Sequence, residues 1–412
     1  MRILVTGGAG FLGSNLAQAL LGKGHEVVAV DNLSMGSIEN LAECLGKEGF
    51  EFIKADVTLD STFENIEQRF DCIVHLAAFK IPRYGKALDT LQINYRGTEK
   101  VLEFARRQDC KCVLASTSDV YGRNPSLPFS EEHTDSVIGS SKAPRWAYAV
   151  SKLFDEHLGL AYQDAYGFPV TLLRFFGSYG PNQHRTWWGG PQSVFIEAVL
   201  RDEVIPIHGD GSQTRSFTYV TDTVAGICSA IEKDEANGEI FNIGSTFEIS
   251  ILDLARKIKE LSGTPGELKV EMIPYESFTG KKYEDVMRRV PDVSLCKRVL
   301  GVEAKVSLYE GLARTIEWQR NLSLADAKTG ERFGSLDRRT LDYDSEDRNR
   351  WCRHVRSGFG AAPGHGRPPC DSLRAVGSTR RIGDVRGSRV LRLRSLLSCN
   401  SSDRSASDLL HR

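Results

Sequence analysis

Residues 6–13 have the sequence TGGAGFLG, and this stretch decides the fold of the first half of the chain. It contains G-x-x-G-x-x-G at Gly7, Gly10 and Gly13, and an overlapping G-x-G-x-x-G that begins at Gly8. Glycines at this spacing let the backbone turn sharply and approach a pyrophosphate bound at the N-terminus of the next helix. The strand-like run ILVT precedes them and the helix-like run FLGSNLAQALLGKG follows. This context predicts a dinucleotide-binding strand–loop–helix unit.

A second strand-like run, HEVVAV, ends at Asp31, eighteen residues after Gly13. An acidic residue near this spacing is suited to bonding the ribose hydroxyls of adenosine. Its carboxylate would repel a 2′-phosphate, and no arginine stands beside it, so we expect NAD rather than NADP. Asp56 is placed to contact the adenine, and residues 76–78 are placed to pass close beneath the cofactor.

The chain as far as about residue 175 alternates helix-like segments with six apolar runs: RILVTG, HEVVAVD, FEFIKAD, CIVHLAA, KCVLAST and PVTLLRF. This alternation is typical of a parallel sheet wrapped by helices. After about residue 176 come loops rich in glycine, proline and aromatics, then amphipathic helices such as ISILDLARKIKELSG, which stops at a glycine. We therefore predict an α/β fold, a Rossmann-type doubly wound parallel sheet over 1–175 with a smaller α/β substrate-binding lobe over 176–325.

Charge is distributed unevenly along the 412 residues, although the net charge is only -1. Residues 331–412 carry 17 Arg, no Lys and 10 acidic residues, a net +7, so the remainder is at -8. The acidic body argues against a nucleic-acid surface. We assign no structure to the tail, 326–412, which is either a disordered basic arm or sequence without a selected fold, as an out-of-frame extension would give. The lack of Lys favours the second.

Apolar runs and cysteine spacing exclude two further classes. No run approaches the roughly 18 to 20 residues of a membrane span, and MRILVTGGAGF enters a strand directly, so we expect a cytoplasmic protein without a membrane partner. The 9 cysteines show no CxxC spacing, so we expect neither a disulfide framework nor a metal site.

The stretch APRWAYAVSKL, residues 143–153, places Tyr148 and Lys152 four residues apart on one predicted helix face. A free tyrosine has a pKa near 10. A nearby ammonium and the positive nicotinamide of NAD+ favour the phenolate, and a pKa lower by about 3 needs roughly 4 kcal/mol. The phenolate can then take a hydroxyl proton while hydride leaves the same carbon. Upstream, ASTSDVYG brings the hydroxyls of Thr117 and Ser118 and the carboxylate of Asp119 to a strand end.

Together these motifs resemble the extended short-chain dehydrogenases/reductases that modify nucleotide sugars. The resemblance runs from residue 2 to about 318 and includes TGGAGFLG, HLAA, STSDVYG, YAVSK, LRFFGSYGP, GDGSQTRSFTYVTD, FNIGS and RVPDVSLCKRVLG. It implies a tightly bound NAD, Tyr148 as the base, Lys152 lowering its pKa and binding the nicotinamide ribose, and Thr117 bonding the oxidised sugar hydroxyl. It also implies a homodimer formed through a four-helix contact. The predicted cofactor-binding residues are Gly7, Gly10, Phe11, Leu12, Gly13, Asp31, Asn32, Asp56, Val57, Leu76, Ala77, Ala78, Asn94, Tyr148 and Lys152.

The same resemblance implies that Arg215 and Arg289 bind the diphosphate or ribose of the nucleotide. Members of the family first oxidise the sugar at C4, and then epimerise, dehydrate or decarboxylate the 4-keto intermediate. Dehydratases and UDP-glucuronate decarboxylases have a glutamate where this chain has Asp119, which keeps the charge but is one methylene shorter. One stretch resembles the corresponding part of a UDP-glucuronate decarboxylase: FSEEHTDSVIGSSKAPRWAYAVSK. This resemblance implies that Arg145 of this chain binds the substrate carboxylate. Gly177 replaces an asparagine that binds the diphosphate in many relatives.

The sequence therefore predicts an NAD-dependent enzyme that acts on a nucleotide sugar through a 4-keto intermediate. We expect this nucleotide sugar to be UDP-linked. Among the possible reactions of this intermediate, we favour UDP-glucuronate decarboxylation slightly over 4-epimerisation and 4,6-dehydration. A non-catalytic NAD sensor is the alternative of another class, and the joint presence of Tyr148, Lys152 and Thr117 argues against it. A steroid or small-alcohol dehydrogenase is disfavoured because Arg215 and the GDGSQ loop suit an anionic nucleotide.

Overall fold

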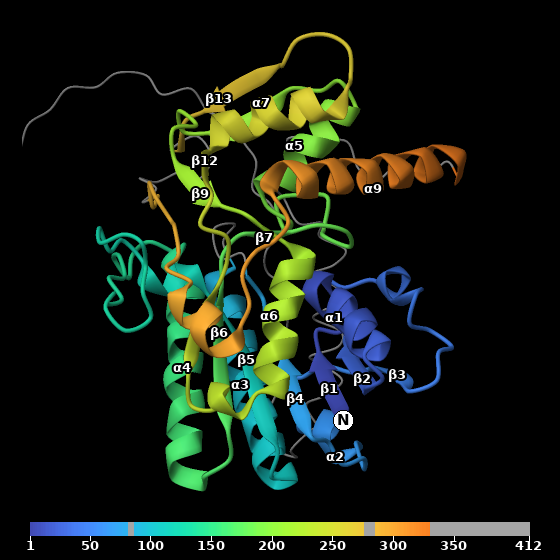
Figure 1. Ribbon diagram of the computed structural model, residues 1–412, viewed down its shortest axis with the longest axis vertical. Helices are drawn as coiled ribbons and strands as arrows, with labels where there is room; N and C mark the ends of the chain where they lie inside the picture. Colours follow the sequence, from blue (N-terminus) through green and yellow to red (C-terminus); the bar gives the residue numbers. More distant parts are fainter. Residues whose placement is uncertain (81–85, 276–284, 330–412) are drawn as a thin grey trace, which may run out of the picture. The chain divides into compact units, whose positions relative to one another are not determined.

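The computed structural model describes residues 1–80, 86–275 and 285–329 (Figure 1). These residues belong to one compact unit. The Arg-rich tail predicted to be unstructured lies outside the described residues, apart from the last turn of a helix that ends at Thr329. Within the described part of the chain, no helix is both long enough and apolar enough to cross a membrane.

Seven parallel strands form the central sheet, in the order β11-β6-β5-β4-β1-β2-β3. The strands are β1 (Arg2–Thr6), β2 (Glu26–Asp31), β3 (Phe50–Lys54), β4 (Cys72–His75), β5 (Lys111–Thr117), β6 (Val170–Phe175) and β11 (Ile240–Ile243). The order runs outward from β1 in both directions, which is the Rossmann-type arrangement with its ligand crevice beside β1 and β4. The predicted doubly wound parallel sheet is confirmed. The first six strands match the six apolar runs, and β11 comes from the chain after residue 176.

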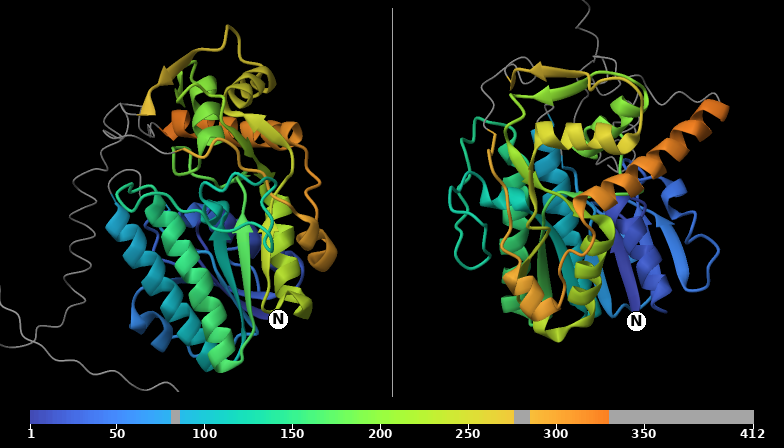
Figure 2. Two further views of the ribbon diagram at one scale, coloured as in Figure 1. Left: turned by 90° about the vertical axis from the view of Figure 1, so that its left-hand side faces the viewer. Right: turned by 45° about the horizontal axis from the view of Figure 1, so that its top comes forward.

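Both faces of the sheet are covered by helices, which explains its continuous apolar strands. In β1, Ile3 and Val5 face one core and Leu4 faces the other, and all three are fully buried. Figure 2 shows α3 and α4 on one side of the sheet and α6 on the other. The covering helices are α1 (Phe11–Gly22), α3 (Ala87–Gln108), α4 (Trp146–Tyr166) and α6 (Val220–Glu232), with the short α2 (Asp60–Glu64) beside α3.

The smaller lobe combines helices with three short two-stranded sheets (Figure 1). Its helices are α5 (Pro191–Leu200), α7 (Ile251–Ser262) and α9 (Leu308–Thr329). Its strand pairs are β7 (Ser178–Tyr179) with β10 (Thr218–Tyr219), β8 (Ile205–His208) with β13 (Val270–Ile273), and β9 (Thr214–Ser216) with β12 (Glu248–Ser250). Helix α7 starts at a Ser250 cap and stops at Gly263, which has φ 62°, so the predicted glycine stop is confirmed.

Short helical turns complete the described chain: η1 (Ile38–Leu41), η3 (Ser118–Tyr121), η4 (Asp234–Ala236) and the π-helical η5 (Cys296–Leu300). One of them, η3, matters for the site because it follows β5 directly and packs against α4. Parallel strands all end at the same edge of a sheet. The glycine loop after β1, the segment after β4, and η3 after β5 are therefore brought together at the carboxyl edge.

Replacing Gly13 by alanine tests the close packing of α1 against the glycine loop. A Cβ atom at Gly13 would lie 2.1 Å from the carbonyl oxygen of Gly7, so the helix must move away from the loop. We expect Gly13→Ala to lower the free energy of unfolding by about 2 kcal/mol and to abolish NAD binding. Urea unfolding and fluorescence titration with NAD measure the two effects.

The matched control is Gly22→Ala, at the other end of the same helix, where a Cβ would meet nothing within 4 Å. This variant should bind NAD normally and be as stable as the wild type, or more stable by up to about 1 kcal/mol. Equal behaviour of the two alanine variants would contradict the packing argument.

Candidate functional site

The glycine loop forms a cradle at the start of α1. Gly10 is the N-cap of the helix, and Phe11 and Leu12 form its first turn, where backbone N–H groups have no partner within the helix. Gly7 has φ 68°, and a Cβ there would lie 2.8 Å from the backbone nitrogen of Ala77. Position 7 therefore leaves room only for glycine, and the loop presents a helix N-terminus at the crevice. They fit the pyrophosphate of a dinucleotide.

An acidic side chain closes one side of this cradle. Asp31, at the end of β2, is 8% exposed, and its two carboxylate oxygens accept hydrogen bonds from the amides of Ala9 (3.1 Å) and Leu33 (2.8 Å). Burial raises the pKa of Asp31, and these amide bonds oppose the rise. The carboxylate is thus fixed against the glycine loop, where a ribose hydroxyl could donate to its remaining lone pairs.

The neighbouring residues predicted for the adenosine end lie together. The side-chain amide of Asn32 donates to one carboxylate oxygen of Asp56 at 3.0 Å. The other oxygen of Asp56 accepts from the backbone amide and the hydroxyl of Thr58. Val57 is 8% exposed and packs in the core on this face of the sheet. Asp56 and Asn32 therefore form one polar edge beside Asp31, which agrees with a shared binding task.

The segment after β4 is anchored to β1 and to helix α3. The amide of Leu76 donates to the carbonyl of Thr6 at 3.2 Å, and the amide of Ala77 donates to the Thr6 hydroxyl at 3.4 Å. Next to Ala78, the backbone of Phe79 is hydrogen-bonded to the side chain of Asn94. The Phe79 amide donates to the Asn94 oxygen at 2.7 Å, and the Asn94 nitrogen donates to the Phe79 carbonyl at 3.2 Å. The segment consequently runs along the crevice at the level of the glycine loop.

Asn94 is buried, and its amide serves the protein itself. Besides its bonds to Phe79, its nitrogen donates to the hydroxyl of Ser151 on α4 at 2.9 Å. The residue therefore ties the segment after β4 to both α3 and α4. The predicted contact of Asn94 with the cofactor stays a prediction, because these three bonds already give the side chain a structural task.

The predicted catalytic hydroxyls and acid follow β5. Thr117 is the last residue of the strand, and its hydroxyl accepts from the amide of Asp119 at 3.2 Å. Ser118 begins η3 and is almost fully buried. Tyr148 lies in the first turn of α4, which packs against η3, and Asp119 and Asp155 both act on its proton affinity. The structure therefore brings Thr117, Asp119 and Tyr148 into one neighbourhood.

The charges around Tyr148 differ from the expectation that Lys152 lowers its pKa. The ammonium of Lys152 lies 3.1 Å from a carboxylate oxygen of Asp155, and both side chains are buried. Burial raises the pKa of Tyr148, and the carboxylates of Asp119 and Asp155 raise it further. The groups of the protein alone thus favour the phenol, so the phenolate depends on a positive charge that the protein does not supply.

Two arginines enclose the acid of η3. A guanidinium nitrogen of Arg289 lies 2.8 Å from an oxygen of Asp119, and one of Arg145 lies 3.7 Å from the same oxygen. Arg289 also donates to the hydroxyl of Ser118 at 3.5 Å. Arg145, just before α4, stacks on the ring of Trp146 and is mostly buried. An anionic substrate group that approaches Asp119 therefore meets two fixed guanidinium groups.

A third arginine belongs to the same charge group. Arg215 on β9 lies 3.0 Å from an oxygen of Asp285, whose other oxygen accepts from the hydroxyl of Tyr275 at 2.5 Å. Burial raises the pKa of Asp285, but Arg215, Tyr275, Arg145 and Arg289 together bring it down to about 2. Three guanidinium groups thus surround two carboxylates, and the excess positive charge suits a diphosphate or a carboxylate.

Gly177 can contribute only its backbone to substrate binding. It has φ 51°, and a Cβ there would lie 2.2 Å from the carbonyl oxygen of Ser216. The backbone therefore leaves no room for the asparagine side chain that the resemblance led us to consider at this position. The prediction that Gly177 contacts substrate is therefore restricted to main-chain groups.

Sequence reasoning did not single out Asn242, which connects both sides of the site. This buried residue on β11 donates to the carbonyls of Phe129 (2.9 Å) and Asp292 (3.1 Å), and accepts from the hydroxyl of Tyr121 at 2.8 Å. Tyr121 belongs to η3 with Asp119, and Asp292 follows Arg289. A polar residue inside the apolar strand IFNI was the available signal.

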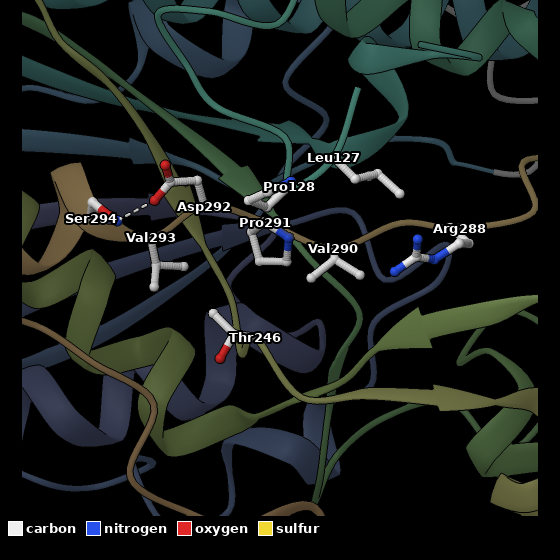
Figure 3. Close-up of a pocket in the computed structure, with 9 residues that line it drawn as sticks. All are labelled: Leu127, Pro128, Thr246, Arg288, Val290, Pro291, Asp292, Val293 and Ser294. Carbon is white, nitrogen blue, oxygen red and sulfur yellow. Dashed lines mark hydrogen bonds between the residues drawn. The ribbon is translucent and has the colours of Figure 1, made fainter. Parts of the chain in front are cut away.

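One pocket is lined by none of the predicted catalytic residues. It has a volume of about 400 Å³ and is lined by Leu127, Pro128, Thr246 and residues of the segment 288–294 (Figure 3). Among its lining residues, Arg288 pairs with Glu248, whereas the adjacent Arg289 pairs with Asp119. We therefore base the site on the Tyr148 neighbourhood. No group of three potential metal-ligating side chains occurs among the residues that the structure describes.

Comparisons with known proteins match most of the chain. The model of the NAD-dependent epimerase/dehydratase family matches residues 3–244. A UDP-N-acetyl-alpha-D-glucosaminuronate decarboxylase of Bacillus cytotoxicus is 36% identical over 78% of this chain and 98% of that protein. UDP-glucuronic acid decarboxylase 1 of Xenopus tropicalis is 38% identical over 77% of this chain and 72% of that protein. A UDP-glucuronic acid 4-epimerase of Bacillus cereus, solved with UDP-glucuronic acid and NAD, aligns with TM-score 0.68 and 30% identity over 78% of this chain and 100% of that chain.

The ion pair of Asp285 should make stability depend on pH. Its pKa is about 2 in the folded protein and about 3.9 in an unfolded chain. A lower folded pKa gives stability that is fully present above about pH 4 and lost as pH falls toward 2, amounting to about 2 kcal/mol. Asp285→Asn should therefore be less stable than the wild type at pH 7, and urea unfolding should show this difference shrinking between pH 4 and pH 2.

Asp253→Asn is the control, because Asp253 also pairs with an arginine, Arg256, but both side chains are more than half exposed. Its effect should stay below about 1 kcal/mol at every pH. A stability difference for Asp285→Asn that is unchanged from pH 7 to pH 2 would refute the assignment of a lowered pKa.

Proposed function

This chain belongs to the NAD-dependent epimerase/dehydratase family, and from that premise we propose that it decarboxylates UDP-glucuronate through a 4-keto sugar intermediate. The observation that carries the proposal is the charge group around Asp119, in which Arg145 and Arg289 lie beside the neighbourhood of Tyr148 and Thr117. A simple alcohol needs no such group. A uronic acid has a carboxylate that two guanidinium groups can bind.

The glycine cradle and Asp31 hold NAD, whose oxidised nicotinamide supplies a hydride acceptor and a positive charge when bound. Tyr148 removes the proton from the C4 hydroxyl, and Thr117 positions that hydroxyl by a hydrogen bond. Lys152 lies one helical turn from Tyr148, on the face that would meet the nicotinamide ribose. Oxidation at C4 makes the sugar a β-keto acid, because the ketone carbon and the carboxyl carbon are both attached to C5.

The second step breaks the bond between C5 and C6. Arg145 and Arg289 fix the carboxylate, while the negative charge of Asp119 beside it favours its departure as neutral CO₂. The electron pair of the broken bond forms an enolate whose charge lies on O4, next to Tyr148. C5 then takes a proton from solvent, and return of the hydride to C4 with the proton of Tyr148 to O4 gives a UDP-pentose.

A second candidate, 4-epimerisation of UDP-glucuronate, is favoured by the likeness to the Bacillus cereus epimerase. It shares the substrate and the first oxidation, and differs in keeping the carboxyl group. UDP-N-acetylglucosaminuronate is a further candidate substrate, because the Bacillus cytotoxicus relative matches over nearly its full length. The assay described below separates these possibilities by product.

We also propose a homodimer formed through α3 and α4. These two helices pack side by side and present exposed apolar side chains: Leu88, Leu91 and Tyr95 on α3, and Val150 and Phe154 on α4. The rings of Tyr95 and Phe154 are 5.5 Å apart, so the exposed residues form one continuous strip. A second copy would bury this strip in a four-helix contact. We place the activity in the cytoplasm, as expected from the sequence.

The assay of the proposed function is incubation with UDP-glucuronate, UDP-N-acetylglucosaminuronate, UDP-glucose and UDP-N-acetylglucosamine. We expect CO₂ and a UDP-pentose from UDP-glucuronate, identified by mass spectrometry and NMR. Tyr148→Phe should retain NAD and lose at least about 100-fold in turnover, because the base is gone while the cofactor contacts remain. An epimer formed without CO₂ would replace the proposal by its second candidate, and full activity of Tyr148→Phe would remove the mechanism.

Asp119→Asn should separate the two chemical steps. The substitution keeps the size of the side chain but removes the negative charge between Arg145 and Arg289. Oxidation at C4, followed as reduced nicotinamide after rapid mixing, should not become slower, because loss of the Asp119 charge also favours the phenolate of Tyr148, whereas release of CO₂ should fall about 100-fold. Equal losses in both steps would show that Asp119 has no special part in the second.

A further inference from the structure

Asp155, which forms an ion pair with Lys152, has no role in the mechanism derived so far. The charged atoms of the pair are 3.1 Å apart, and the exposed fractions of the two side chains are 1% and 3%. Asp155 lies nearly one turn of α4 after Lys152, and its carboxylate also acts on Tyr148. A carboxylate at this depth is costly unless an opposite charge compensates it.

The surroundings of Asp155 contain little else that could compensate its charge. The carboxylate of Asp155 is bound by the ammonium of Lys152 and by the uncharged hydroxyl of Thr98. Among the described residues, Nε2 of the buried His75 makes no hydrogen bond. Burial raises the pKa of Asp155, and the ammonium of Lys152 opposes that rise. Burial also lowers the pKa of His75, to about 3, so this imidazole is neutral at pH 7. The ammonium of Lys152 is thus the principal partner of the carboxylate.

The next residue on the helix provides a contrast. Glu156 accepts two hydrogen bonds from Arg174, at 2.9 and 2.7 Å, and one from the hydroxyl of Ser116 at 2.5 Å. That pair is satisfied by its own bonds and does not involve Lys152 or Tyr148. Two adjacent buried acids on α4 therefore have different partners, one structural and one in the active site.

We propose that Asp155 is a positioning residue of the active site, whose carboxylate anchors the ammonium of Lys152 and cancels its charge at Tyr148. This inference rests on the proposed role of Tyr148 as the base. The charged groups that act on Tyr148 are then Asp119 on η3 and the neutral pair of Lys152 with Asp155 on α4. Tyr148 becomes a strong base only while a positive nicotinamide is bound, and it regains its phenol proton when that charge is gone.

Asp155→Asn tests the proposal because asparagine keeps an oxygen that Lys152 can donate to, and removes only the charge. With the charge of Lys152 no longer cancelled, the phenolate of Tyr148 is favoured. In a plot of the rate of C4 oxidation against pH, the rising part on the acid side should shift to lower pH by about one unit. At a fixed pH in that range, oxidation should therefore be about tenfold faster than in the wild type. Asp155→Glu keeps the negative charge, so its profile of C4 oxidation against pH should lie close to that of the wild type.

A second readout needs no substrate. Tyrosinate absorbance of the NAD-loaded protein, measured against the same protein with Tyr148→Phe, should show Tyr148 titrating about one pH unit lower in Asp155→Asn. This measurement remains informative if no UDP-uronate is turned over, so failure of the proposed function and failure of this inference can be told apart.

Glu156→Gln is the matched control, since it removes a buried, ion-paired acid from the adjacent position of the same helix. Glu156→Gln should lower the free energy of unfolding measured in urea and leave the pKa of Tyr148 unchanged. The proposal is overturned if Asp155→Asn behaves like this control, with reduced stability and an unmoved pH profile, because Asp155 would then be a structural residue only.

Discussion

All seven strands of the central sheet run in the same direction, so their carboxyl ends meet at one edge, and the whole site depends on this constraint. The edge receives a glycine cradle from β1, an anchored segment from β4, and hydroxyls with an acid from β5. Helix α4 then starts at the same edge and adds Tyr148. Residues more than a hundred positions apart in the chain thereby become neighbours.

Charge is the second theme of the site. Carboxylates lie near Tyr148 from two sides, and the ammonium expected to offset them is paired with Asp155. Farther out, arginines exceed the acids that they contact. The site is therefore poor in positive charge where the nicotinamide would bind, and rich in it where an anionic substrate would bind. Such a division favours oxidised NAD at one end and a nucleotide-linked uronic acid at the other.

The sequence was sufficient for the parts of the structure that follow local rules. Strand periodicity and the glycine spacing predicted six strands, the cradle and the position of Asp31, because each depends on nearby residues. The strand β11, the bonds of Asn242 and the pairing of Lys152 with Asp155 were not predicted. They depend on which segments the fold brings together. The i, i+4 spacing of Tyr148 and Lys152 indicated a shared face, but could not show that a buried acid competes for the lysine.

The central claim is that Tyr148 is the base for the C4 hydroxyl of a uronic acid whose carboxylate lies between Arg145 and Arg289. A crystal structure of the Tyr148→Phe protein with NAD and UDP-glucuronate tests it most directly. The account predicts the C4 hydroxyl within about 3 Å of the Thr117 hydroxyl, facing the ring of residue 148, with the carboxylate bonded to both arginines. A sugar bound with its carboxylate away from these arginines, or with C4 turned from that ring, would contradict it.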